Sequence, residues 1–178
     1  MHWKLYAKRI LIYFLLVVLA FVLQTCVIPF FTIFSSAPNL ILIITFSYGF
    51  IYGTATGIIC GFFAGLMMDL FYTEPFGLFI LIYSYLGYFS GLFSHTFRTD
   101  SYVLPVMLCL LNELIYNAAI LAYRYMALGS VHFQYSLRNI ILPEVFFTLL
   151  VTLVVYRILL GAHRQLDISD DLRGQNVA

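Results

Sequence analysis

One glutamate stands within a long apolar stretch of this chain and is the residue most able to do chemistry. Glu113 lies in the stretch 102–123, and Asn112 and Asn117 stand close by. Because Asn117 follows Glu113 by one helical turn, a helix would place both on one face. A charged side chain at the centre of a membrane helix costs about 2.5–3.5 kcal/mol. Two interpretations stay open: an interhelical hydrogen-bonding knot, or a proton- or ligand-binding site.

Two further acidic residues lie toward the ends of apolar stretches, Asp69 and Glu144. Arg124 and Arg138 are expected on the same side of the membrane as these carboxylates. Ion pairs such as Asp69 with Arg138 are therefore compatible with the sequence. We expect the carboxylates mainly to anchor helix ends.

Glycines recur at a helical spacing of four residues. The series consists of Gly53, Gly57, Gly61 and Gly65, and a shorter pair is Gly87 and Gly91. On a helix this spacing makes a smooth face that another backbone can approach closely. The face could pack against another helix of the same chain or receive a partner's helix. Both use the same small-residue packing, so the sequence leaves both open.

Other chemistry has no support in the sequence. The three cysteines are widely spaced and offer no disulfide framework or CxxC metal site. The four histidines lack metal-ligand spacing, and no serine stands in a nucleophile elbow. We predict no catalytic residues, no metal and no cofactor.

The composition is that of a membrane protein. Hydrophobic residues make up 63% of the 178, charged residues only 10%, and the mean hydropathy is +0.98. Soluble domains are about 45–50% apolar and about 25% charged. Nine basic residues against eight acidic ones leave no basic stripe for nucleic acid. We therefore expect a single integral membrane domain over residues 1–160, with no nucleic-acid partner.

The run from 39 to 70 decides how many times the chain crosses the membrane. As one helix it would be about 48 Å long, against a hydrocarbon core of about 30 Å. A tight break between Tyr48 and Thr54 would divide it into two helices. With six spans, seven basic residues lie on the cytoplasmic side and two outside; with five spans the split is five to four. The positive-inside rule favours six.

The sequence thus predicts an all-α membrane protein with both termini in the cytoplasm. The expected spans are about 10–30, 38–52, 54–72, 76–97, 102–123 and 137–160. A mobile, polar cytoplasmic tail is expected over 161–178.

Several short motifs resemble those of the MreD family of rod shape-determining proteins. They are Pro38-Asn39, the glycine-spaced run ending Gly65-Leu66 and Asp69-Leu70, and Pro75-Phe76-Gly77-Leu78, with Gln24, Gly87 and Gly91 also fitting. The resemblance covers about residues 20–95. Asn39 stands where many members have Asp, and Phe76 where Leu is usual.

The resemblance implies a non-enzymatic, multi-pass subunit of the bacterial cytoplasmic (inner) membrane. Such a subunit would bind MreC within the cell-elongation complex that includes MreB, RodA and a penicillin-binding transpeptidase, and so help to maintain cell shape and organise lateral peptidoglycan synthesis. It also implies a six-helix fold similar to the substrate-binding subunits of energy-coupling-factor transporters. The alternative is a small-molecule-binding transporter subunit, which Glu113 with Asn112 and Asn117 suggests.

Overall fold

The computed structural model describes residues 11, 14–27, 37–71, 75–94, 103–129 and 133–175. All secondary structure in these ranges is helical. The elements are an N-terminal helix (Phe14–Cys26) that passes into the π-helix η1 (Leu23–Val27), then α3 (Leu40–Tyr52), α4 (Thr54–Phe71), α5 (Leu78–Leu92), α6 (Val103–Leu128), α7 (Phe133–Ser136), the π-helix η2 (Leu137–Ile141) and α8 (Leu142–Gln175).

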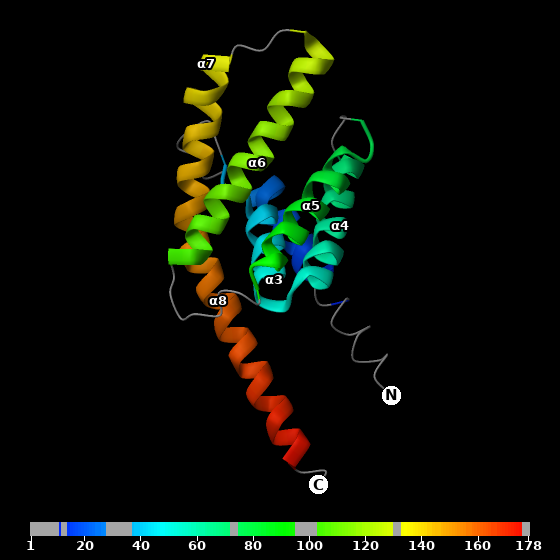
Figure 1. The fold of residues 1–178 in the computed structure, drawn as a ribbon, viewed down its shortest axis with the longest axis vertical. Coiled ribbons are helices and arrows are strands. Elements are labelled where there is room, and N and C mark those ends of the chain that lie inside the picture. The colour runs from blue at the N-terminus through cyan, green and yellow to red at the C-terminus, as the bar shows by residue number, and fades with distance from the viewer. Residues whose placement is uncertain are drawn as a thin grey trace.

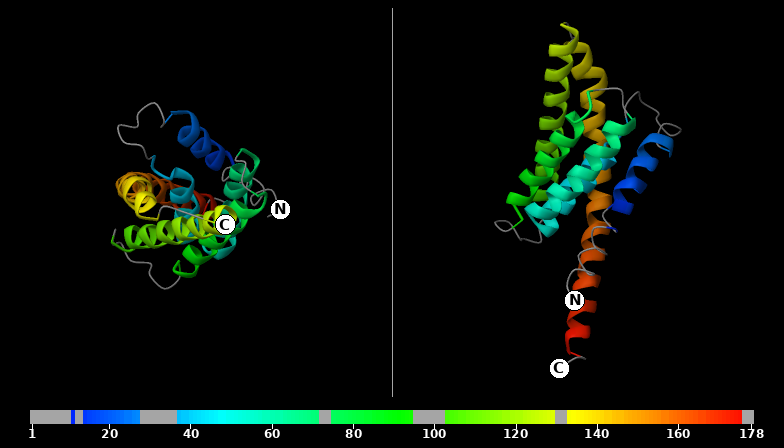
Figure 2. Two further views of the ribbon diagram at one scale, coloured as in Figure 1. Left: turned by 90° about the horizontal axis from the view of Figure 1, so that it is seen from above. Right: turned by 90° about the vertical axis from the view of Figure 1, so that its right-hand side faces the viewer.

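The described part of the chain contains six apolar helices. They form one bundle in which successive helices alternate in direction (Figures 1 and 2). Three are long and apolar enough to cross a membrane: Thr54–Phe71, Val103–Ala127 and Leu137–Ile158. The other three, including α3 and α5, are apolar but shorter. The helix α8 continues to Gln175 and projects beyond the bundle (Figure 1). The expected mobile tail is therefore helical over 161–175.

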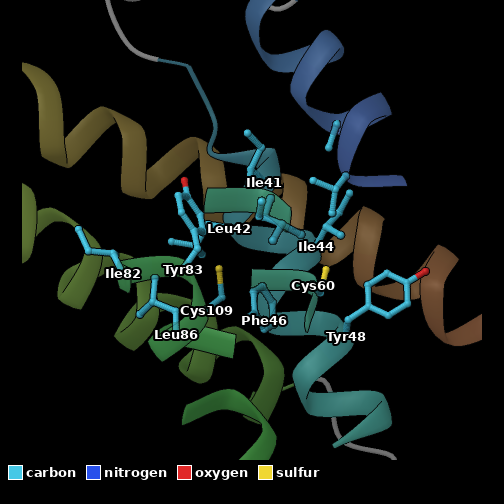
Figure 3. Close-up of a cluster of buried hydrophobic side chains, with 14 of the residues drawn as sticks. Ile41, Leu42, Ile44, Phe46, Tyr48, Cys60, Ile82, Tyr83, Leu86 and Cys109 are labelled. Atoms are coloured by element: carbon cyan, nitrogen blue, oxygen red, sulfur yellow. The ribbon is translucent and has the colours of Figure 1, made fainter. Parts of the chain in front are cut away.

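Helix α3 lies at the centre of the bundle. All ten residues from 41 to 50 are buried, which is typical of a helix that is apolar on every side. It contacts α4, α5, α6 and α8. Figure 3 shows Phe46 of α3 surrounded by Cys60 of α4, Leu86 of α5 and Cys109 of α6. The N-terminal helix packs on α4 through aromatic side chains such as Phe14 against Phe63.

A single residue, Gly53, separates α3 from α4. Its φ of +96° lies in the region that residues with a side chain rarely adopt, so glycine permits the reversal. The predicted break between Tyr48 and Thr54 is confirmed and lies at Gly53. Gly49, also in that stretch, is inside α3 instead.

Three helices meet at what we call the glycine junction: Gly49 of α3, Gly57 of α4, and Gly87 and Gly91 of α5. A Cβ added at Gly57 would overlap the Gly87 carbonyl, and one added at Gly87 would overlap Gly57 in return. At Gly49 an added Cβ would lie 2.6 Å from the same Gly87 oxygen. Side chains are therefore excluded where these backbones cross.

The α4 glycine stripe continues along α5. An added Cβ at Gly61 would overlap the Tyr83 carbonyl and lie 2.8 Å from Ser84 Cα, and one at Gly65 would overlap Ile80. Of the two alternatives that the sequence leaves open, the structure shows internal packing at Gly61 and Gly65, because α5 of the same chain lies along this stripe. Gly53 serves the turn, and Gly87 and Gly91 face α4 and α3.

We predict that Gly61→Ala destabilises the protein. Forcing even one methyl group into a packed seam costs about 1–3 kcal/mol, because the two backbones must separate. Thermal unfolding of the detergent-solubilised protein would show a lower melting temperature. The control is Ala55→Leu on the exposed side of α4, which should leave stability unchanged. Equal melting temperatures for Gly61→Ala and the parent protein would contradict the close seam.

Candidate functional site

The start of α3 is buried and is capped by side chains from three parts of the chain. Asn39 is 1% exposed, and its side-chain oxygen accepts from the backbone N–H of Leu42 at 3.1 Å. The Gln24 side chain accepts from the N–H of Ile41 at 3.1 Å. The N–H of Asn39 itself donates to Thr148 Oγ1 of α8 at 3.0 Å. These bonds pair the N–H groups that a helix leaves open at its first turn.

Asn39 also ties α3 to α5, since the Tyr83 hydroxyl donates to its side-chain oxygen at 3.3 Å. Sequence reasoning placed Asn39 in a family motif and missed this capping role. The signal was present, because Asn immediately before an apolar helical run is a typical N-cap. Thr148 was missed as well, and a threonine inside an apolar helix carries no such signal.

Asp69 performs the same task for α5 from the end of α4. Its two carboxylate oxygens accept from the backbone N–H groups of Gly77, Phe79 and Ile80 at 3.0, 3.1 and 3.0 Å. Gly77 has a φ of +103°, which lets the chain fold over the carboxylate. The expected anchoring of a helix end is thus observed. The ion pair of Asp69 with Arg138 is not formed: backbone groups bind the carboxylate, and Arg138 is exposed.

The polar residues of α6 separate into two environments. Asn112 donates through Nδ2 to Ser90 Oγ of α5 at 2.9 Å and to the Leu108 carbonyl at 2.9 Å. Asn117 donates to the backbone carbonyl of Glu113 at 3.1 Å. The interhelical hydrogen-bonding knot therefore runs through Asn112. Neither asparagine bonds to the Glu113 carboxyl group.

Glu113 is fully buried, with 0% exposure. Within the described part of the chain, neither carboxyl oxygen has a hydrogen-bond partner. Thr148 and Asn117 lie beside the group without bonding geometry, and Glu144 of α8 is close enough to act on it electrostatically. No cluster of three metal-ligating side chains occurs among the described residues. Glu113 is therefore a buried acceptor without a donor.

A cavity of about 210 Å³ lies beside this group, between α6 and the η2–α8 segment. It is lined by Tyr116, Asn117, Ile120, Leu121 and Arg124 of α6, and by Ser136, Ile140, Ile141 and Glu144 across from them. Arg124 acts electrostatically on Glu144, yet the two form no salt bridge. Asn117 and Glu144 therefore face one space, whereas Asp69 and Asn112 belong to other contacts.

Comparison with known proteins identifies the family. The sequence profile described as rod shape-determining protein MreD matches residues 6–161. The chain belongs to the MreD family. No curated protein and no solved structure gives a significant match. The match confirms the resemblance and extends it well beyond residues 20–95, while the similarity to energy-coupling-factor subunits stays a prediction.

The residues by which this MreD protein resembles its family stabilise the fold: they cap helices and allow close helix packing. Gln24 and Asn39 cap α3, Asp69 and Gly77 form the start of α5, and the glycines let α4 and α5 touch. Asn39 offers one acceptor oxygen to the start of α3, and an aspartate carboxylate at this position would offer that acceptor too. Glu113 and the cavity lie outside these motifs.

We predict that Asp69→Ala loosens the start of α5. Three N–H groups lose a charged acceptor, and each hydrogen bond to a charged group contributes about 1.5–3 kcal/mol. Hydrogen exchange should accelerate at Gly77, Phe79 and Ile80 and stay slow toward Leu92. The matched control is Leu70→Ala at the exposed neighbouring residue, which should change exchange neither at the start of α5 nor toward its end. If Asp69→Ala leaves the exchange rates at Gly77, Phe79 and Ile80 unchanged, or accelerates exchange equally along all of α5, the capping role is contradicted.

At the start of α3 we predict different effects from two substitutions of one residue. Asn39→Leu leaves the buried Leu42 N–H unpaired, at about 1–3 kcal/mol, and also removes the acceptor of the Tyr83 hydroxyl. Asn39→Asp keeps the acceptor and ranks with Asn as an N-cap, so it should retain most of the stability. Chemical unfolding in detergent would compare them. Equal losses for both variants would show that the acceptor oxygen is not what matters.

Proposed function

We propose that this MreD protein is a non-enzymatic subunit of the cell-elongation complex that binds MreC. The observation that carries the proposal is the family match over residues 6–161, which is most of the chain. The role is to hold MreC in register with RodA, MreB and a penicillin-binding transpeptidase, and so to maintain cell shape and organise lateral peptidoglycan synthesis.

The proposed topology is six crossings of the cytoplasmic (inner) membrane with both termini in the cytoplasm. Six apolar helices that alternate in direction support it, because an even number of crossings returns the chain to its starting side (Figure 2). The basic residues support the same orientation, since six spans leave only Arg124 and Arg138 outside.

The family resemblance implies that MreC has a single membrane-spanning helix, and this helix would then contact an outward face of the bundle. The α4–α5 seam is already filled, so the available surfaces are the outward sides of the other helices. Large apolar side chains cover them: Leu15 and Leu19 on the N-terminal helix, Met107, Leu111 and Leu114 on α6, and Phe146, Leu150 and Leu153 on α8. Van der Waals packing and release of lipid would drive this association.

The test is extraction of the tagged protein from its native membranes in mild detergent, followed by mass spectrometry of what remains bound. We expect MreC together with elongation synthases. Recovery of an ATPase module or a transported metabolite without MreC would overturn the proposal and favour the transporter alternative.

A second experiment locates the contact. Leu19→Trp, Leu111→Trp and Leu150→Trp each add bulk to one outward face without entering the core. We expect one of them to reduce MreC recovery severalfold while the melting temperature stays unchanged. Gly61→Ala should lower recovery only in proportion to the loss of folded protein. Full recovery from all three tryptophan variants would show that MreC does not bind through these faces.

A further inference from the structure

The cavity between α6 and η2–α8 holds opposite charges that do not neutralise each other. Arg124 and Glu144 both line it, and their charges interact, but they form no salt bridge. A guanidinium group offers five N–H donors and no acceptor, and a carboxylate offers only acceptors. Both groups therefore keep unused hydrogen-bonding capacity at one cavity, which is open to the outside where Arg124 is exposed.

The carboxylate side of the cavity carries a second, deeper acidic group. Glu113 lies one helical turn before Asn117, which lines the cavity, and Glu144 is close enough to act on Glu113 electrostatically. Both of its oxygens are buried, and neither forms a hydrogen bond within the described part of the chain. Two carboxyl groups against one guanidinium leave this side short of hydrogen-bond donors. An ammonium group supplies three.

The size and walls of the cavity limit what can enter. Its volume of about 210 Å³ is below the roughly 300–1,000 Å³ of pockets for drug-sized ligands. Ile120 and Leu121 form one apolar wall, and Ile140 and Ile141 of η2 form another. A π-helix places an extra residue in the turn and is frequent at functional sites. A small charged group with apolar flanks fits this space.

We propose that this cavity binds a zwitterion that carries a primary ammonium group and a phosphate. Glu144 binds the ammonium, the buried Glu113 carboxyl group lies behind it as a further acceptor, and Arg124 binds the phosphate. Arginine suits this role because its planar fork pairs with two phosphate oxygens at once. The same chemistry occurs in an aminophospholipid headgroup and in a free phosphoethanolamine compound. The site does not depend on MreC binding and goes beyond the scaffold role.

The test uses native mass spectrometry of the purified full chain in detergent with three lipids of equal acyl chains. Phosphatidylethanolamine should be retained over phosphatidylglycerol, which lacks the amine, and over phosphatidylcholine, whose ammonium has no N–H. Glu144→Gln and Arg124→Gln should each weaken retention about tenfold, the loss of one charge-assisted hydrogen bond. Equal retention of the three lipids, or unchanged retention in Glu144→Gln, would overturn the proposal.

Two controls separate binding from folding and one source of the ligand from the other. Arg138→Gln removes an exposed charge on η2 that does not line the cavity, so it should retain phosphatidylethanolamine fully. Melting temperatures of all variants should match the parent protein. Soluble glycerophosphoethanolamine is tested for thermal stabilisation: an effect assigns the site to a free zwitterion, and retention of the lipid alone assigns it to a membrane lipid. If glycerophosphoethanolamine does not stabilise the protein and phosphatidylethanolamine is not retained, the proposed site is rejected.

Discussion

The crossing of three backbones at the glycine junction is the constraint on which the rest of the bundle depends. Because Gly57 and Gly87 have no side chains, α4 and α5 touch along their length, and Gly49 brings α3 against both. This contact buries α3 on every side and makes it the centre of the fold. Lipid gives helices no hydrophobic reason to associate, so such close packing has to supply much of the attraction.

Short helices create a second requirement that the same bundle meets. At 1.5 Å per residue, α3 and α5 are only about 20 and 22 Å long, against a hydrocarbon core of about 30 Å. An N–H group left open at such a buried start would cost several kcal/mol. Asn39 and Gln24 complete α3, and Asp69 completes α5. Each cap also joins two helices, which stiffens a subunit whose proposed task is to hold others in place.

The polar groups of α6 differ from these caps, because several of their atoms lack hydrogen-bond partners among the described residues. Asn112 donates to Ser90, whereas its side-chain oxygen and both Glu113 oxygens have no hydrogen-bond partner among the described residues. Glu113 also adjoins a cavity that Arg124 and Glu144 line without forming a salt bridge. Groups at helix starts are satisfied within the chain and maintain its architecture. The polar groups between α6 and α8 keep hydrogen-bonding capacity that a ligand could use. The scaffold and the proposed zwitterion site therefore occupy different parts of one bundle.

The sequence by itself determined the helical class, the six apolar segments, the break that Gly53 makes and the family, because composition, charge and glycine spacing are local properties. Only the tertiary structure decided what fills the glycine face, since small-residue spacing is the same for an internal and an external helix. It also decided the partners of Asp69 and Asn39. The Asn39 bond to Thr148 spans 109 positions, and no local pattern specifies which distant group arrives there.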